Sequence, residues 1–130
     1  MKKIIILALG LLLLIPAGMT AKKKQAVAQF AETTYNFGTI PENGGPVTHE
    51  FGFTNSGDGN LVIIDARADC GCTKPEFPAK PIAPGGHGKI KVTFNPKYQP
   101  AQFNKVITVQ TNGKQKKVRL KISGNIDKNK

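Results

Sequence analysis

Residues 47–68 read VTHEFGFTNSGDGNLVIIDARA, and this stretch contains two strand patterns separated by a turn. Apolar residues alternate with polar ones on both sides of the turn, which is the period of a half-buried strand rather than that of a helix. The turn itself, residues 55–60, is rich in Asn, Gly, Ser and Asp, the residues that favour reversals of the chain. The alternate positions are occupied by Val47, His49, Phe51 and Phe53, and after the turn by Val62, Ile64, Ala66 and Ala68.

The same alternation returns twice further along the chain. It involves Ile90, Val92 and Phe94, and then Val118, Leu120 and Ile122. Further turn signals lie at residues 41–46, 84–88 and 111–114, and two more strands are expected at 31–37 and 103–111. No segment after residue 28 has a helical period. The sequence therefore predicts an all-β fold, an immunoglobulin-like antiparallel β-sandwich of about seven short strands over residues 29–125, with an exposed C-terminal tail at 126–130.

The first 21 residues have the pattern of a signal peptide. Lys2 and Lys3 precede an apolar run of twelve residues, Ile4 to Ile15, which is short of the ~20 residues that a membrane span needs. Cleavage is expected after Ala21, or as late as Ala28, where residues 26–28 form an A-x-A pattern. The mature domain is then periplasmic or secreted, with no integral membrane span.

The chain is basic, with a formal net charge of +11. An excess of positive charge attracts anionic partners at long range, so an anionic glycan is a candidate ligand beside an unknown envelope protein. Export, the absence of Trp and the presence of only two Tyr argue against nucleic acid. The positions between the apolar residues of two strands are basic, and if these strands share a sheet they form a basic face. The residues of this candidate face are Lys89, Lys91, Lys117, Arg119 and Lys121.

Several motifs together resemble one known family. They are YNFGTI at 35–40, HEFGFTNSG at 49–57, LVI at 61–63, CGCT at 70–73 and IAPGGHGKIKVTF at 82–94. This pattern is similar to the bacterial secreted domain-of-unknown-function family numbered 1573, over about residues 30–125. The turn and strand at 82–94 are also similar to major-sperm-protein-like and related immunoglobulin-like domains. The resemblance implies an exported sandwich that binds or scaffolds, and it implies no activity.

Cys70 and Cys72 carry the most distinctive chemistry of the chain. An exported setting favours a disulfide between them, which would be strained if both residues were extended, and a strained bridge is easily reduced. Two thiolates could instead bind a soft metal such as Cu(I). The third possibility is structural, with the pair serving as buried residues or as a clamp on the loop that follows. Strand parity places Cys70 on the inward face, and Gly71 is expected to supply the bend.

The loop from Cys70 to Pro84 is the candidate interaction surface, with Thr73 and Phe77 as its contact residues. Its four prolines stiffen the segment and lower the entropy cost of binding. The only histidines, His49 and His87, are expected at the core margin and in a turn rather than as metal ligands.

Catalytic motifs for hydrolysis or phosphate binding are absent from the sequence. We therefore expect a non-enzymatic binding or scaffolding module of the cell envelope without a cofactor. The alternative is a thiol-active protein, copper-binding or redox, that acts through Cys70 and Cys72.

Overall fold

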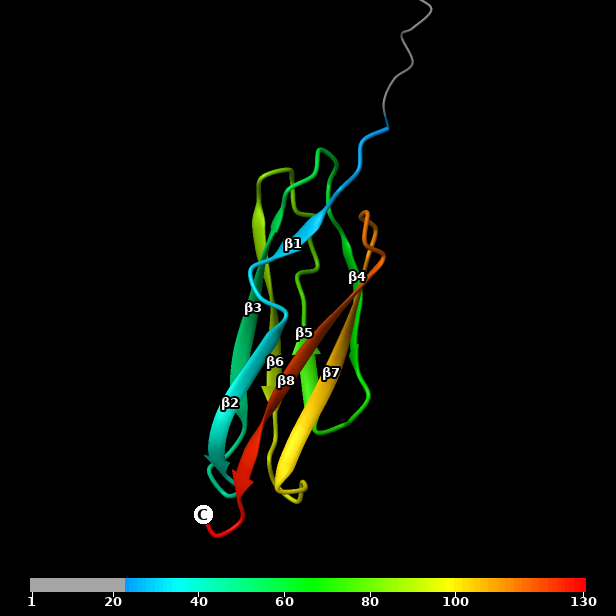
Figure 1. Cartoon of the computed structure of the whole chain (residues 1–130). Helices are drawn as coiled ribbons and strands as arrows, with labels where there is room; N and C mark the ends of the chain where they lie inside the picture. The colour runs from blue at the N-terminus through cyan, green and yellow to red at the C-terminus, as the bar shows by residue number, and fades with distance from the viewer. Residues whose placement is uncertain (1–22) are drawn as a thin grey trace, which may run out of the picture.

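Two four-stranded sheets pack face to face in the computed structural model, which describes residues 23–130 (Figure 1). The first sheet has the order β1-β3-β6-β5, with the bounds β1 Ala28–Phe30, β3 Val47–Asn55, β6 His87–Phe94 and β5 Thr73–Glu76. The second has the order β2-β8-β7-β4, with the bounds β2 Thr34–Pro41, β8 Lys117–Asp127, β7 Gln102–Thr111 and β4 Ile63–Ala68. The predicted all-β sandwich is confirmed. The predicted signal peptide, residues 1–21, lies outside the described residues.

The structure has more strands than the sequence indicated, and one pair runs parallel. The strand expected at 31–37 is found as β2, shifted to Thr34–Pro41, and an additional short strand, β1, precedes it in the other sheet. After the crossing at residues 31–33, β2 runs beside β8 in the same direction, with Thr34 opposite Lys121 and Ile40 opposite Ile126. The other strand pairs are antiparallel. The antiparallel sandwich expected from the sequence therefore includes one parallel strand pair.

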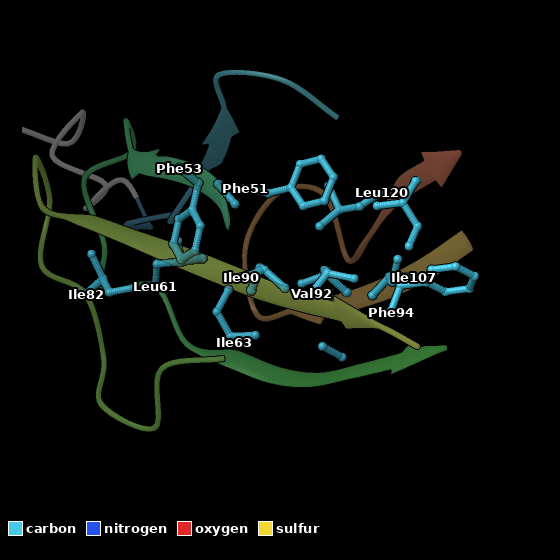
Figure 2. Close-up of a cluster of buried hydrophobic side chains, with 14 of the residues drawn as sticks. Phe51, Phe53, Leu61, Ile63, Ile82, Ile90, Val92, Phe94, Ile107 and Leu120 are labelled. Carbon is cyan, nitrogen blue, oxygen red and sulfur yellow. The ribbon is translucent and has the colours of Figure 1, made fainter. Parts of the chain in front are cut away.

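The core lies between the two sheets and is built from the inward positions of their strands (Figure 2). Phe94 of β6 stacks on Phe103 of β7 with 4.1 Å between ring centroids, which joins the two sheets directly. Each large apolar side chain buried in this way contributes roughly 1.5–3 kcal/mol. The largest fully buried apolar side chains are Phe51, Phe94, Leu61, Ile90, Ile107, Leu120, Ile122, Val92 and Val109.

The predicted inward positions hold in β3, β6 and β8, whereas in β4 the prediction fails at Ile64. Ile63 is buried while Ile64, which was expected to face inward, is 50% exposed. The pairing of β4 with β7 shifts register between Ile63 and Asp65, so a β-bulge reverses the side-chain alternation at this point. Ala66, beyond the bulge, is buried as predicted.

The predicted exposed tail at 126–130 is shorter than expected. β8 continues to Asp127, and Ile126 is buried opposite Ile40 of β2. The N–H of Ile126 also donates to the carbonyl oxygen of Ala101 at 2.7 Å. The strand is extended because Ile126 follows the inward parity of Ile122, and only residues 128–130 are exposed after it.

Asn55, at the end of β3, is a fully buried polar residue whose side chain makes four hydrogen bonds. Its Oδ1 accepts from the backbone N–H groups of Val27 at 3.2 Å and Gly57 at 3.0 Å. Its Nδ2 donates to the carbonyl oxygens of Gly59 at 2.7 Å and Ile82 at 2.9 Å. The carboxamide therefore joins three segments that are distant in sequence: the entering chain, the 55–60 turn and the segment that leads to β6.

The backbone of Asn55 completes this junction. Its N–H donates to the carbonyl oxygen of Gly86 at 2.9 Å, and its carbonyl accepts from the N–H of Gly85 at 2.8 Å. Gly85 has a φ of 83°, a conformation that glycine adopts without steric cost. The turn before β6 is consequently held against the end of β3.

Replacing Asn55 by Ala is expected to lower the free energy of unfolding by about 2–4 kcal/mol, because two N–H and two C=O groups would lose buried partners. Asn60→Ala, in the same turn but exposed, is the matched control and should change stability by less than about 0.5 kcal/mol. Urea unfolding followed by circular dichroism measures both. Equal stabilities for the two variants would contradict the assigned role of Asn55.

Candidate functional site

Cys70 and Cys72 lie where the chain crosses from β4 in the second sheet to β5 in the first. Their Sγ atoms are 2.02 Å apart and their Cα atoms 5.1 Å apart. The N–H of Thr73 donates to the carbonyl oxygen of Cys70 at 3.1 Å, which closes a tight turn. This Cα separation falls within the ordinary range for bridged cysteines.

Gly71, at the tip of this turn, was expected to be needed for the bend. It does not have a positive φ, and a Cβ atom built on it would meet no atom within 4 Å. Any small residue would therefore fit the turn. The bend results from the Cys70–Thr73 hydrogen bond rather than from the conformational freedom of glycine.

The second half of the turn is anchored in the protein. Cys72 packs against the core, and its carbonyl oxygen accepts from the N–H of Asn95 at 2.9 Å. Thr73 is only 5% exposed and opens β5 opposite Phe94. Thr73 was predicted to be a contact residue of an exposed loop, and this was wrong, because the segment pairs with β6 at that point.

Two exposed apolar side chains lie along the side of the sandwich formed by β4 and β5. Phe77, which directly follows β5, is 37% exposed, and its place on an interaction surface stays a prediction. Ile64 on β4 is 50% exposed and was missed, because the bulge that turns it outward leaves no signal in the apolar alternation. β4 and β5 contact one another, and each is the outermost strand of its sheet. We call Ile64, Phe77 and these two strands the β4–β5 edge.

The segment after Phe77 is tied to the sandwich at its far end. Leu61 and Ile82 exchange two backbone hydrogen bonds of 2.8 Å, and both residues are buried. Pro75 sits in β5 itself, a position that suits an edge strand because proline has no N–H to donate. The proline-rich segment is thus attached at both ends.

The five residues of the predicted basic face do not form one face, because β6 belongs to the first sheet and β8 to the second. On β6, Lys89 pairs with Glu50 at 3.0 Å, and Lys91 lies in register between Glu50 and Glu76. That surface is mixed in charge.

The β8 part of the predicted basic face remains together. Lys117, Arg119 and Lys121 are exposed at alternate positions of one strand. Uncharged residues lie opposite them on β7, with Gln110 beside Lys117 and Thr108 beside Arg119. Of the predicted basic face, only these three residues of β8 lie together in the structure.

The histidines lie apart from the cysteine turn. His49 is half-buried, hydrogen-bonded to Glu32 and stacked on Tyr35, as expected of a residue at the core margin. His87 begins β6 rather than lying in a turn, and its Nδ1 is 2.8 Å from Oγ1 of Thr54. Within residues 23–130, no three His, Cys, Asp or Glu side chains gather as a group that could hold a metal ion.

The two packed sheets define the chain as an immunoglobulin-like β-sandwich. The model of the family described as Protein of unknown function (DUF1573) matches residues 28–126, and the chain belongs to this family. No curated protein matches the chain. None of the described residues forms a helix long and apolar enough to cross a membrane.

Solved structures share the fold at low sequence identity. A protein of unknown function from Porphyromonas gingivalis W83 has a TM-score of 0.67 and 16% identity, over 84% of this chain and 50% of that one. PapD-like domain 7 of human CEP192 has a TM-score of 0.59 and 14% identity, covering 85% and 92%. The CupB2 chaperone of Pseudomonas aeruginosa has a TM-score of 0.51 and 17% identity, covering 77% and 55%. The chain spans about half of the Porphyromonas protein, and these likenesses concern the fold alone.

Gly71→Ala is expected to change the free energy of unfolding by less than about 0.5 kcal/mol, because open space surrounds the turn. Gly57→Ala is the contrasting variant, since its Cβ would lie 2.2 Å from the carbonyl oxygen of Gln25, and it should destabilise by about 1–3 kcal/mol. Denaturant unfolding of both proteins without reductant is the measurement. A large loss at Gly71 would show that the turn needs glycine after all.

Proposed function

We propose that this protein is an exported, non-enzymatic binding or scaffolding module of the cell envelope, and that it binds a partner protein through the β4–β5 edge. The observation that carries the proposal is the exposure of Ile64 on β4 and of Phe77 directly after β5, two outermost strands that contact one another. Exposed apolar residues grouped on a protein surface commonly mark an interaction site.

The strands themselves favour this kind of contact. An outermost strand presents backbone N–H and C=O groups to which an extended segment of a partner can add. β5 is short and contains Pro75, which limits its capacity to pair, whereas β4 has six residues and carries Ile64. We therefore expect β4 to supply the backbone contacts and Phe77 an adjacent apolar contact.

A disulfide between Cys70 and Cys72 is part of this proposal. The positions of the two sulfur atoms support it, and an oxidising compartment would maintain it. A bridge that closes so small a loop contributes little, about 1.5 kcal/mol in the chain-entropy description. Its role would be to hold the crossing from β4 to β5, and hence the relative positions of Ile64 and Phe77.

Export itself is proposed from the amino-terminal sequence, and the packing of residues 25–28 bears on where the signal peptide is cut. Ala26 and Ala28 are buried, and the N–H groups of Ser56 and Lys114 donate to Val27 and Ala26. Cleavage after Ala28 would remove these contacts. We therefore favour the earlier site, after Ala21.

One mass measurement tests processing, the disulfide and the thiol-active alternative together. Protein taken from the envelope without reductant is expected to begin at Lys22, to weigh two hydrogens less than the reduced chain and to resist alkylation. Native and denaturing spray should give the same mass. Two alkylated cysteines together with a copper adduct in the native spectrum would replace the scaffold with a metal-binding protein, and an unprocessed chain would contradict export by cleavage.

Photo-crosslinking in living cells tests the proposed edge. A photoreactive residue at position 64 or 77 should give a discrete crosslinked product, whereas one at the exposed Thr34 of β2, on the opposite side of the sandwich, should not. Ile64→Lys should reduce the product obtained from position 77 at least several-fold without lowering stability, because Ile64 is exposed. Equal products from positions 34, 64 and 77 would refute a specific β4–β5 edge.

A further inference from the structure

The end of the sandwich at which the chain enters carries a concentration of lysines. The entering segment and the turns at 55–60 and 111–116 all lie at this end, while the C-terminus lies at the other (Figure 1). The basic side chains of this end are those of Lys23, Lys24, Lys114 and Lys116, and all four residues are exposed. We call these four residues the entry-end lysines.

Three of the four line one cavity of about 460 Å³. Lys23 and Lys24 come from the entering segment, and Lys116 comes from the turn between β7 and β8. The side chains of Asn60 and Asn112 complete the polar lining. No carboxylate lines this cavity, so it presents ammonium groups and amides to a ligand.

Hydrogen bonds fix the chain segments that carry the entry-end lysines. The N–H of Lys114 donates to the carbonyl oxygen of Ala26 at 2.9 Å, which fixes the β7–β8 turn against the entering segment. Asn112 is also fixed, because its Oδ1 accepts from the N–H of Val62 at 2.8 Å and its Nδ2 donates to the carbonyl oxygen of Asn60 at 3.1 Å. The segments that carry the positive charges therefore have a defined arrangement.

The acidic residue of this end is already engaged. Oδ1 of Asp58 accepts from the backbone N–H of Gln25 at 2.7 Å. Asp58 does not line the cavity, and no salt bridge joins it to a lysine within the described chain. One carboxylate thus faces four ammonium groups, and the end as a whole remains strongly positive.

The opposite end differs in its charges. There Lys128 pairs with Glu42 at 2.6 Å, and the N–H of Tyr98 also donates to Glu42. The Lys128 hydrogen bond, helped by the Tyr98 N–H, lowers the pKa of Glu42, so the carboxylate stays charged and balances its neighbour. That end thus has a lysine paired with a carboxylate, whereas the cavity of the entry end is lined by lysines and by no carboxylate.

We propose that the entry-end lysines bind the phosphate groups of an anionic phospholipid surface, so that the sandwich docks on the membrane by this end. The short length of chain between the apolar run and Lys23 supports a membrane surface as the ligand. The apolar run ends at Ile15, and seven residues separate it from Lys23, a span of at most about 25 Å. Until the proposed cleavage after Ala21, this short spacing keeps the entry end close to the lipid head groups of a membrane that holds the apolar run.

The chemistry fits this ligand. Ammonium groups form charge-assisted hydrogen bonds with phosphate oxygens, and each lysine near an anionic membrane adds about fivefold to affinity, the equivalent of ~1 kcal/mol. Cleavage after Ala21 would leave all four entry-end lysines on the mature chain, so the site persists after the signal peptide is removed. This site is separate from the β4–β5 edge and does not depend on the function proposed for that edge.

The test uses protein purified from the cells that produce it, with its N-terminus known from its mass, and vesicles of phosphatidylcholine with or without phosphatidylglycerol. Binding is expected to the anionic vesicles only, and to fall steeply at about 1 M salt, where the screening length is ~3 Å. Removing two charges by Lys114→Gln with Lys116→Gln should weaken binding to the anionic vesicles roughly 25-fold. Co-sedimentation at a series of lipid concentrations measures the affinities.

The matched control removes the same charge elsewhere. Lys89→Gln with Lys91→Gln lies on the outer face of the first sheet, and should weaken binding by less than about threefold, since screening limits the reach of distant charges. Equal weakening by the two pairs would overturn the proposal in favour of net charge alone. Equal binding to neutral and anionic vesicles would also overturn it. Binding to soluble dextran sulfate but not to anionic vesicles, lost in the Lys114 and Lys116 variant, would assign the site to an anionic glycan instead.

Discussion

The hydrogen bonds of the buried Asn55 carboxamide are the interaction on which the entry end of the sandwich depends. It satisfies two backbone donors and two backbone acceptors, and backbone hydrogen bonds between the same segments add to the junction. A buried backbone group without a partner costs about 1–3 kcal/mol, so the side chain at this position has to be both a donor and an acceptor. Asn meets that requirement, and no apolar residue of similar size does.

The Asn55 junction fixes two chain segments in place. The entering residues 25–28 are fixed against the 55–60 turn, and the 82–86 segment is fixed against the end of β3. Through Leu61 and Ile82, the same constraint reaches the far end of the proline-rich segment that follows Phe77. The Asn55 junction is thus connected by hydrogen bonds both to the entering segment and to the segment that follows Phe77.

Charge is distributed unevenly over the molecule, and this distribution gives more information than the net value. On β6, Lys89 pairs with Glu50 and Lys91 lies in register with acidic residues on both sides, and near the C-terminus Lys128 pairs with Glu42. Unmatched positive charge remains on β8 and among the entry-end lysines. A basic composition predicted an anionic ligand in general terms, but only the spatial arrangement distinguishes a balanced surface from one that attracts anions.

The sequence by itself determined the fold class, the inward faces of β3, β6 and β8, the positions of the main turns, and the cysteine pair as the chemically distinctive feature. These follow from local causes: the two-residue period of a strand, the conformational preferences of Gly, Asn and Pro, and the reactivity of the thiols. Only the tertiary structure decided that β6 and β8 lie in different sheets, that Thr73 is buried, and that a bulge turns Ile64 outward. It also decided which lysines gather at one end. The physical reason is that periodicity reports how a strand faces its own surroundings, whereas the identity of its neighbours is set by hydrogen bonds and packing between residues far apart in the chain.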